Sequence, residues 1–376
     1  MSSNKLYRTG VQEDARRTTS GDDSGFLARF GKEKIKVGII FGGQSVEHEV
    51  SLWSAQNVMH ACFGAGHEVE MIYVDKNGEW NGSSDFVDLF FLTVPAELAE
   101  KIKTIEVGKV SVLPGNGLWL GESKLELDVV FPVIHGTGGE DGVLQGCLEM
   151  AGLPYVGCGV LASAIGMDKV VTKVLAQQVG IPVAKYLVAT ATMQPKFLDV
   201  EKELGLPVFV KPASLGSSVG VTKVKNEEEF VMAVSKALEF DTKVLIEEAV
   251  IGREIECGVL EDGELRVSGV GEVATTHDFY SYEAKYLDEK GVTISLPAVI
   301  PDDAKTLIQH YALILAKTIG VQGLSRVDFF YSDKGEVILN EINTLPGFTA
   351  LSMWPMLWKH EGYSDVQIVN ALLRSA

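Results

Sequence analysis

The sequence predicts a protein of mixed α/β class whose first domain is an open, doubly wound sheet. The apolar run from Ile35 to Phe41 has the composition of a buried strand, and it ends in glycines before a helical pattern from Leu52 to Phe63. Two further strand-like runs follow at Glu68–Val74 and Asp128–Ile134, with helical segments between them. Strands that alternate with helices predict a sheet covered on both faces.

The bulk composition indicates a soluble globular chain of two or three domains. The 376 residues are 46% hydrophobic and 22% charged, with a mean hydropathy of +0.15. The 33 basic and 51 acidic residues give a net charge of −18. A chain this acidic lacks the basic field needed to bind nucleic acid or an anionic membrane surface, so we expect neither partner.

The cysteines and the apolar runs indicate a cytoplasmic location. The four cysteines are scattered without C-x-x-C spacing, so we expect free thiols in a reducing compartment; they are Cys62, Cys147, Cys158 and Cys257. No apolar run is long enough to span a membrane, and no signal-peptide core precedes the first strand.

Residues 1–34 are polar and aperiodic, so we predict a disordered extension or a tag there and exclude it from the fold. Within the first domain a hairpin is expected at Val110–Leu120. The third strand runs into the glycine-rich stretch from His135 to Gly142, and a helix is expected from Val143 to Ala151. A glycine-rich end of a strand suits a chain that passes close to a ligand, but a plain tight loop would look the same.

Zinc is a weak alternative for this end of the domain. Glu47, His48 and His135 could ligate a metal ion in principle, but neither H-x-H nor H-E-x-x-H spacing supports such a site.

The middle of the chain predicts a phosphate-covering loop. One long amphipathic helix is expected from Gly159 to Gly180, and it carries Lys169. A later strand ends in Lys211, and a loop of small and hydroxyl residues follows as far as Gly220. Such a loop can surround phosphate oxygens with backbone N–H groups while the lysine supplies positive charge. The lysine precedes the glycines, so this is not a P-loop, and the β-like continuation predicts a flap between strands.

The remaining elements up to the C-terminus follow the same reading. We expect a helix at Glu227–Phe240, a strand at Val244–Val250 and a hairpin that turns at Gly263. The polar, aromatic and aperiodic segment 275–292 is long for a loop in a compact domain, and we predict that it is a lid. Helices are expected at Asp302–Gly320 and Asp365–Ser375.

The segment RVDFFYSDKGEVILNEINTLPG predicts a functional hairpin. Two strand-like runs flank the turn signal SDKG, and we place the centre of the turn between Lys334 and Gly335. Asp328 then lies opposite Glu341, and Arg326 lies opposite Asn343. Because residues two apart share a face of a strand, all four side chains should project together.

These four side chains predict a magnesium–phosphate centre. Like charges directly opposite one another destabilise a sheet, so the two carboxylates need a cation. Carboxylate and amide oxygens are ligands that Mg²⁺ prefers, and the neighbouring arginine suits an anion held by that metal. A solvated outer face of the hairpin is the alternative for any one of these acids.

Seven motifs in order resemble those of the D-alanine–D-alanine ligases of the ATP-grasp superfamily, and the resemblance covers the chain from Lys36 onward. They are FGGQSVEHEVSLWSA, HGTGGEDG, YVGCGVLASAIGMDK, KPASLGSSVGV, YSYEAKY, SRVDFF and LNEINTLPG. The resemblance implies an N-terminal doubly wound α/β domain followed by a two-lobed ATP-grasp fold of α/β and α+β class. The implied division is 1–34 extension, 35–160 N-terminal domain, 161–246 small lobe and 247–376 C-terminal lobe.

The resemblance also implies an ATP and metal site. The implied ATP-binding residues are Lys169, Lys211, Gly216, Ser217, Ser218, Glu247, Glu248, Val250 and Glu254. The lysines would contact the phosphates, the loop would cover them, and Glu254 would bind the ribose. Asp328, Glu341 and Asn343 would coordinate two Mg²⁺ ions, with Mn²⁺ able to substitute, which agrees with the prediction from the hairpin register.

Two D-alanine molecules would bind beside the nucleotide, in contact with residues from several parts of the chain. Glu47 would hold the ammonium group of the first, with His135 close by, and Glu47 would form a catalytic triad with Ser217 and Tyr286. Arg326 and a backbone N–H near Gly347 would stabilise the oxyanion. Lys285 and Ser352 would hold the carboxylate of the second D-alanine.

The implied reaction is the ATP-dependent synthesis of D-alanyl-D-alanine for peptidoglycan precursors through a D-alanyl phosphate, by a homodimer. Tyr286 and Glu47 favour D-alanine as the second substrate. Two alternatives stay open. The first is a related enzyme, either a D-alanyl-D-lactate or D-serine variant or another ATP-grasp carboxylate–amine ligase. The second is a nucleotide-binding module without activity.

Overall fold

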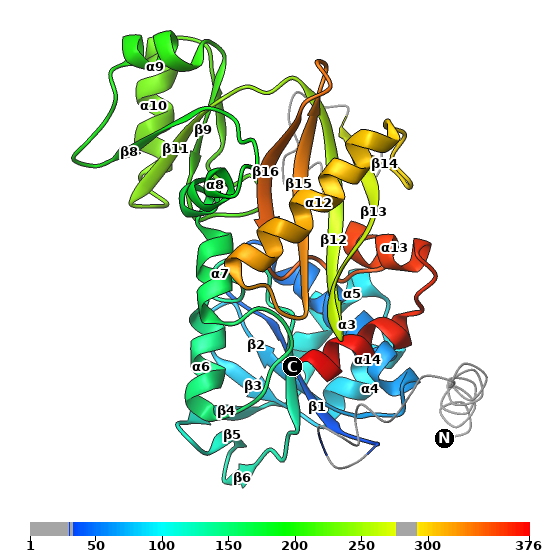
Figure 1. Ribbon diagram of the computed structural model, residues 1–376. Helices are drawn as coiled ribbons and strands as arrows, with labels where there is room; N and C mark the ends of the chain where they lie inside the picture. Colours follow the sequence, from blue (N-terminus) through cyan, green and yellow to red (C-terminus); the bar gives the residue numbers. More distant parts are fainter. Residues whose placement is uncertain (1–29, 31–32, 276–291) are drawn as a thin grey trace.

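The computed structural model describes residue 30 and residues 33–275 and 292–376 (Figure 1). The predicted N-terminal extension lies almost wholly outside the described residues. The predicted lid at 275–292 also lies outside them, apart from its two end residues. The described chain forms three sheets, with the N-terminal sheet at the bottom of Figure 1 and the two others above it.

The N-terminal sheet has seven strands in the order β6-β5-β4-β3-β2-β1-β7. β1 (Lys36–Gly42) pairs in parallel with β2 (Glu68–Val74) and with β7 (Val129–Pro132). The other four strands extend the sheet in antiparallel pairs: β3 (Trp80–Gly82), β4 (Gly108–Leu113), β5 (Gly117–Leu120) and β6 (Ser123–Lys124). The β4–β5 pair confirms the hairpin predicted at Val110–Leu120.

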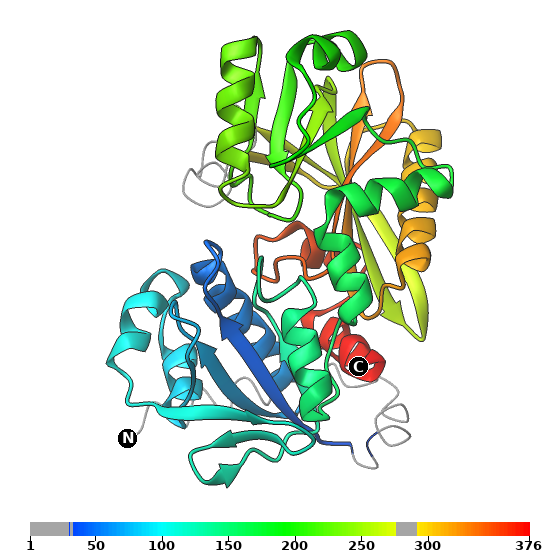
Figure 2. The same cartoon turned by 90° about the vertical axis from the view of Figure 1, so that its left-hand side faces the viewer.

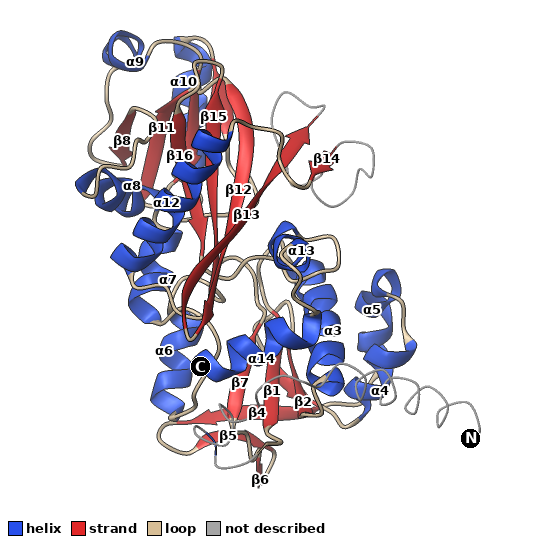
Figure 3. Ribbon diagram, turned by 45° about the vertical axis from the view of Figure 1, so that its right-hand side comes forward, coloured by secondary structure: helices blue, strands red, loops and turns tan. Residues whose placement is uncertain are grey.

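Helices cover both faces of this sheet, which confirms the doubly wound prediction (Figures 2 and 3). Alternating β1 residues point to opposite faces, so Ile39 and Phe41 join one buried cluster and Ile40 joins another. The first cluster contains side chains of α3 (His48–Gly64), α4 (Asp85–Leu92) and α5 (Pro95–Lys101), and a short 3₁₀ helix η1 (Ile102–Thr104) follows α5. The second contains α6 (Val143–Ala151).

The second sheet has four antiparallel strands in the order β10-β9-β11-β8. They are β8 (Tyr186–Thr190), β9 (Val208–Pro212), β10 (Thr222–Val224) and β11 (Lys243–Glu248). Side chains of α9 (Phe197–Leu204) and α10 (Glu227–Ala237) complete its core. The loop 213–221 joins two paired antiparallel strands, as predicted for a flap.

The third sheet carries the predicted functional hairpin. Its order is β14-β13-β12-β15-β16, formed by β12 (Gly252–Asp262), β13 (Glu264–Thr275), β14 (Val292–Ser295), β15 (Leu324–Ser332) and β16 (Val337–Asn343). Buried side chains of α12 (Asp302–Ile319) pack against this sheet. α14 (Asp365–Ser375), with α13 (Met353–His360) before it, packs against both β12 and α3, so the C-terminus joins this sheet to the N-terminal domain (Figure 3).

The single helix predicted over Gly159–Gly180 is wrong, because the chain breaks it at Asp168. α7 (Val160–Met167) ends there and α8 (Lys169–Gln178) begins. Asp168 has an extended backbone, with φ −85° and ψ 100°, and its carboxylate accepts hydrogen bonds from the N–H groups of Val170 and Val171. An aspartate in this capping position starts a new helix, and Lys169 becomes its first residue.

A β-bulge sets the register of the functional hairpin. Asp328 pairs with Glu341 and Arg326 pairs with Asn343, which confirms both predicted pairs. Nearer the turn the pairing is shifted by one residue relative to the predicted register, and Phe329 pairs with Leu339. Asn340 is therefore an extra residue in β16. The turn is therefore centred on Lys334, half a residue from the predicted position, and the bulge restores the predicted pairing at the site.

All four cysteines are free, as predicted, and three of them are buried. Burial raises the pKa values of Cys158 and Cys257 to about 12, so these thiols stay protonated and pack as small apolar groups. Among the helices of the described chain, none combines the length and the apolar character needed to cross a membrane.

Replacing Asp168 should test whether its cap fixes the break between α7 and α8. Asp168→Ala removes two cap hydrogen bonds and the ion pair with Lys243, so the free energy of unfolding should fall by about 1–2 kcal/mol. Urea unfolding measures this loss. Asp168→Asn is the matched control, because it keeps a capping oxygen and should lose less. Equal stability of Asp168→Ala and the wild type would contradict this account of the break.

Candidate active site

The residues predicted to bind ATP line one cavity of about 450 Å³ between the four-stranded and five-stranded sheets. All nine predicted ATP-binding residues line it, together with Arg326, Asp328 and Glu341. The nine are Lys169, Lys211, Gly216, Ser217, Ser218, Glu247, Glu248, Val250 and Glu254. Asn343 lies in a smaller adjoining hollow with Lys169 and Glu341. The volume is in the range of small-molecule sites.

Arg326 and Asp328 of the cavity lining form a hydrogen-bonded cluster with Asn343 of the adjoining hollow. Arg326 donates from Nε to Oδ1 of Asp328 over 2.8 Å and from Nη2 to Oδ2 over 2.7 Å. The Asn343 amide nitrogen donates to the same Oδ2 over 2.9 Å. These contacts follow from the hairpin register, which puts residues 326, 328, 341 and 343 on one face.

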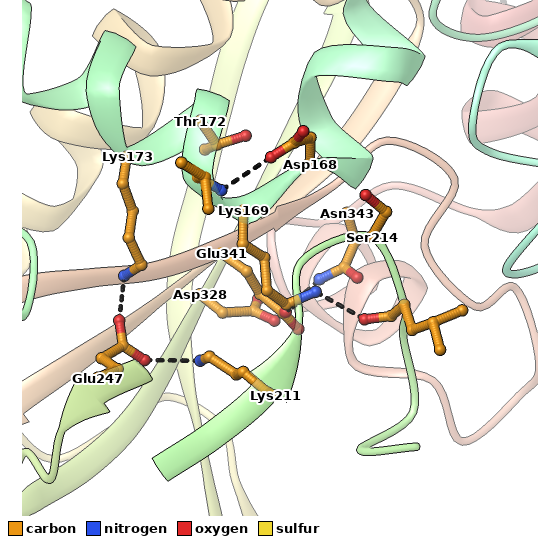
Figure 4. A network of polar contacts seen from close by, with 12 residues as sticks. Asp168, Lys169, Thr172, Lys173, Lys211, Ser214, Glu247, Asp328, Glu341 and Asn343 are labelled. Atoms are coloured by element: carbon orange, nitrogen blue, oxygen red, sulfur yellow. Dashed lines mark hydrogen bonds and ion pairs between the residues drawn. The ribbon is translucent and has the colours of Figure 1, made fainter. Parts of the chain in front are cut away.

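Three lysines and two glutamates form a second cluster beside the first (Figure 4). Lys169 and Lys173 lie four residues apart on α8 and share a face of that helix. The Lys169 ammonium lies 3.2 Å from Oε2 of Glu341. Glu247 on β11 lies between two lysines: its Oε2 is 2.6 Å from Nζ of Lys211, and its Oε1 pairs with Lys173.

Burial makes these charges depend on one another. Burial by itself would raise the pKa of Glu247, but the Lys211 and Lys173 ammonium groups outweigh it and lower that pKa. Burial would also lower the pKa of Lys211, and the Glu247 carboxylate outweighs it and raises that pKa. Lys173 is the most buried, and burial lowers its pKa despite Glu247. Lys211 and Glu247 therefore stabilise one another's charges although both are buried.

The predicted phosphate-covering loop is held over the cavity from both sides. The Lys169 ammonium donates to the carbonyl of Leu215 over 2.7 Å. Ser217 donates from Oγ to Oε1 of Glu47 over 2.6 Å, which ties the loop to the N-terminal domain. Ser217 and Ser218 have φ values of +50° and +58°. Residues other than glycine rarely adopt this left-handed backbone conformation. The contacts of the loop therefore stabilise a strained backbone.

Glu47 is placed by the start of α3 and by a glycine that leaves room for it. Glu47 is the residue before α3, and its carboxylate approaches the glycine-rich end of β7. A Cβ atom added at Gly136 would lie 3.0 Å from Oε2 of Glu47, and Gly136 has φ +75°. A side chain there would crowd the carboxylate, so Gly136 leaves room for Glu47, and the predicted approach of these glycines to a ligand stays a prediction.

His135 is buried, and both of its ring nitrogens have protein partners. Nδ1 lies 3.0 Å from the carbonyl oxygen of Leu345, which can only accept, so Nδ1 carries the proton. Nε2 then accepts from the hydroxyl of Ser54 at 2.9 Å, and Ser54 in turn accepts from the backbone N–H of Phe348. Burial lowers the pKa of His135, which keeps the ring neutral. His135 thus fixes the segment that follows β16.

Gly347 and Ser352 lie together after β16. A Cβ atom added at Gly347 would lie 2.8 Å from the hydroxyl oxygen of Ser352, so only glycine fits there. The Ser352 hydroxyl accepts from the backbone N–H of Thr349 over 3.1 Å. Of the other predicted substrate contacts, Lys285 and Tyr286 lie outside the described residues.

The donor set at the hairpin fits a divalent ion whose coordination shell also includes phosphate. Asp328, Glu341 and Asn343 supply hard oxygen donors on one face, and Asp328 is 8% exposed. Within the described chain no group of three His, Cys, Asp or Glu side chains gathers to hold a metal by itself. Two carboxylates and an amide suit Mg²⁺, which usually keeps oxygen ligands from water and from a bound nucleotide.

Sequence reasoning missed several charged residues of the site, including the ion pair of Arg253 and Glu272, which line the cavity. Lys173 was detectable, since it lies one helical turn after Lys169. Glu256 was also detectable, because it lies two residues after Glu254 on the same strand and so shares its face. Glu140 belongs to the glycine-rich motif after β7 and lines the small hollow beside Lys169. Burial and the nearby Glu47 carboxylate raise the pKa of Glu140 to about 8.

Comparison with known proteins gives matches over almost the whole chain. Residues 36–158 match the family model described as D-ala D-ala ligase N-terminus, and residues 175–374 match the one described as D-ala D-ala ligase C-terminus. A D-alanine–D-alanine ligase of Oceanobacillus iheyensis is 45% identical over 351 residues, which cover 91% of this chain and 95% of that protein.

Two solved structures have the same fold. The VanG D-Ala:D-Ser ligase of Enterococcus faecalis has a TM-score of 0.80 and 36% identity, and the match covers 90% of this chain and 98% of that one. The D-alanine-D-alanine ligase of Coxiella burnetii has a TM-score of 0.80 and 33% identity, with 92% and 94% covered.

The buried His135 should make the protein less stable as the pH falls. Burial lowers the pKa of folded His135, so below pH of about 6.5 the unfolded chain binds a proton that the folded chain resists. This contribution is fully present above that pH and is lost as the pH falls. His135→Asn should therefore flatten the decrease in melting temperature between pH 7 and 5, while lowering stability at pH 7.5 by about 1–3 kcal/mol.

Scanning calorimetry across this pH range measures both effects. His310→Asn, at an exposed position of α12, is the matched control and should leave the pH dependence unchanged. If His135→Asn had the wild-type slope, His135 would not be the titrating group.

Proposed function

This chain belongs to the D-alanine–D-alanine ligase family, and we propose that it joins two D-alanine molecules into D-alanyl-D-alanine with ATP as the energy source. The product would serve as a peptidoglycan precursor. The main structural support for this reaction is the lining of one cavity. The cations Lys169, Lys211 and Arg326 line it together with the oxygen donors Asp328 and Glu341. Cations and hard oxygen donors around one cavity suit the transfer of a phosphoryl group.

The nucleotide would bind with its phosphates at the lysines and its base at β11. Lys211 is held by the buried Glu247 carboxylate and Lys169 by the half-buried Glu341 carboxylate, so both lysines are oriented before any phosphate arrives. The loop from Gly216 to Ser218 would cover the phosphates with backbone N–H groups. Glu248 and Val250 would contact the base and Glu254 the ribose, since all three line the same cavity as the two lysines.

Asp328, Glu341 and Asn343 would hold Mg²⁺, with two ions and with Mn²⁺ as a substitute. Bound there, the ions would withdraw charge from the phosphate oxygens. Asn343 presents its amide nitrogen to Asp328 in this structure, and a turn of the amide would present the oxygen instead. Arg326 would remain beside the transferred group and offset part of the negative charge on it, in addition to the metal ions.

The first D-alanine would bind between Glu47 and Arg326. Glu47 would hold its ammonium group, and Ser217 on the loop already donates to that carboxylate. His135 would act indirectly, by fixing the segment at Leu345 whose neighbouring backbone N–H at Gly347 would stabilise the oxyanion. Ser352, next to Gly347, would hold the carboxylate of the second D-alanine, with Lys285 and Tyr286 completing the site.

The order of the chemistry follows from the weakness of a carboxylate as an electrophile. The first D-alanine would take the γ-phosphoryl group and become an acyl phosphate, and ADP would leave. The amine of the second would then attack the carbonyl carbon, and inorganic phosphate would leave the tetrahedral intermediate. Because water hydrolyses acyl phosphates, the buried position of Asp328 and Arg326 favours the peptide product.

D-serine as the second substrate is the other candidate, and the likeness to a D-Ala:D-Ser ligase favours it. The roles proposed for Glu47 and Tyr286 support D-alanine instead. The two candidates share the nucleotide and metal chemistry and differ only in the second amino acid.

We also propose the cytoplasm as the location and a homodimer as the assembly. The four free cysteines support a reducing compartment. Exposed apolar side chains along α6 and α7, Val143 at 67%, Met150 at 66% and Leu161 at 71%, support a protein contact there, and light scattering would detect a dimer. The division at 1–34, 35–160, 161–246 and 247–376 stays part of the proposal.

Phosphate release with ATP, Mg²⁺ and D-alanine tests the proposed function directly. We expect release only in the presence of D-alanine, with D-alanyl-D-alanine as the product by mass spectrometry and with L-alanine inactive. Mixtures of D-alanine with D-serine or D-lactate separate the alternatives, because each gives a product of different mass. A lack of any ligated product from these mixtures would refute the proposal.

Glu341→Gln tests the metal assignment without a change of shape. The loss of one charged ligand should lower phosphate release at least about a hundredfold, because the phosphates lose part of their counter-charge. Glu336→Gln, near the turn of the same hairpin and exposed, is the matched control and should keep full activity. Turnover of the Glu341 variant at the wild-type rate would remove Glu341 from the metal site.

A further inference from the structure

Three carboxylates occupy one row across three neighbouring strands of the five-stranded sheet. Glu256 on β12 pairs directly with Asp328 on β15, and Asp328 pairs directly with Glu341 on β16. Glu256 is 5% exposed and Asp328 is 8% exposed. Acidic groups directly opposite one another destabilise a sheet unless a cation lies between them. Glu256 has no part in the proposed metal or nucleotide contacts, so its presence in this row needs an explanation.

Arg326 is the cation between Glu256 and Asp328. Its Nε donates to Oδ1 of Asp328 over 2.8 Å, and the same nitrogen lies 2.9 Å from Oε2 of Glu256. An arginine guanidinium keeps its charge at every pH at which the protein is folded. The guanidinium therefore stays charged and has two carboxylates in reach without moving.

A metal ion at Asp328 would compete with Arg326 for the same carboxylate. The two Asp328 oxygens accept three hydrogen bonds, two from Arg326 and one from Asn343, which leaves little acceptor capacity for an ion. A divalent ion beside these oxygens also repels the guanidinium, so its binding weakens the pairing of Arg326 with Asp328. A buried guanidinium that loses its counter-charge is strongly destabilised. A second carboxylate already 2.9 Å away removes this obstacle.

We propose that Glu256 is a positioning residue that takes over Arg326 when Asp328 binds the metal. This inference rests on the proposed function, because it needs a metal ion at Asp328. Glu256 would act in two ways: it releases Asp328 for the ion, and it keeps the guanidinium at the cavity, where the phosphoryl group is transferred. A direct metal ligand is the rival role. Against that role, no three acidic, histidine or cysteine side chains of the described chain converge on one point.

The test measures Mn²⁺ affinity by electron paramagnetic resonance, with ADP present and no turnover. In Glu256→Gln, Arg326 has only Asp328 as a partner and competes with the ion, so Mn²⁺ affinity should fall by about tenfold. In the Arg326→Met background this competitor is absent, and the added Glu256→Gln change should have almost no effect. Asp262→Asn is the matched control, because it removes an arginine-paired carboxylate at the other end of β12.

A second readout separates positioning from mere stability. Steady-state rates of Glu256→Gln should need more Mg²⁺ and recover towards the wild-type value when Mg²⁺ is saturating, which a folding defect would not do. Glu256→Asp keeps the charge but withdraws it from Arg326, and it provides the same comparison if the amide variant does not fold.

Two results would overturn the inference. An equal loss of Mn²⁺ affinity with and without Arg326 would make Glu256 act on the ion itself. Unchanged Mn²⁺ affinity in Glu256→Gln would leave it no role at the metal. Both results leave the proposed function intact if the wild type still releases phosphate with D-alanine, whereas a wild type that neither binds Mn²⁺ nor releases phosphate would refute the proposed function.

Discussion

Pairing of opposite buried charges is the constraint on which this site depends. Eight charged groups of the site lie against at least one of the other sign, in three sets: Glu247 between Lys173 and Lys211, Lys169 beside Glu341, and Arg326 between Asp328 and Glu256. A buried charge without such a partner costs several kcal/mol. The sets join α8 and five strands from two sheets, so the arrangement of the sheets and the arrangement of the charges determine one another.

This pairing also reconciles an acidic chain with an anionic substrate. The chain carries a net charge of −18, and bulk electrostatics would repel a nucleotide. The carboxylates nearest the cavity are occupied by lysines and arginine. The cations are fixed in place by those carboxylates and need little reorganisation when phosphate arrives, which is the condition for electrostatic catalysis.

Hydrogen bonds of the N-terminal domain reach both upper sheets close to the cavity. Glu47 holds the loop of the four-stranded sheet through Ser217, and His135 holds the segment after β16 through the carbonyl of Leu345. Both residues lie at ends of elements in the first domain, where side chains can reach a neighbour. The substrate contacts proposed for Glu47 therefore depend on the relative position of three bodies, and the C-terminal helix α14 helps to fix it by packing against α3 and β12.

The sequence by itself determined the α/β class of the first domain, most strand and helix positions and the face shared by Asp328 and Glu341, because period-two and glycine patterns are local. Only the tertiary structure decided the break at Asp168, where a side-chain cap overrides helical periodicity, and the bulge at Asn340, which depends on pairing with a second strand. The structure also brought Lys173 and Glu256 into the site, although their spacing from Lys169 and Glu254 made both of them candidates in the sequence. Isolated charges on a helix or strand look solvated in sequence, and only packing reveals which of them must find a buried partner.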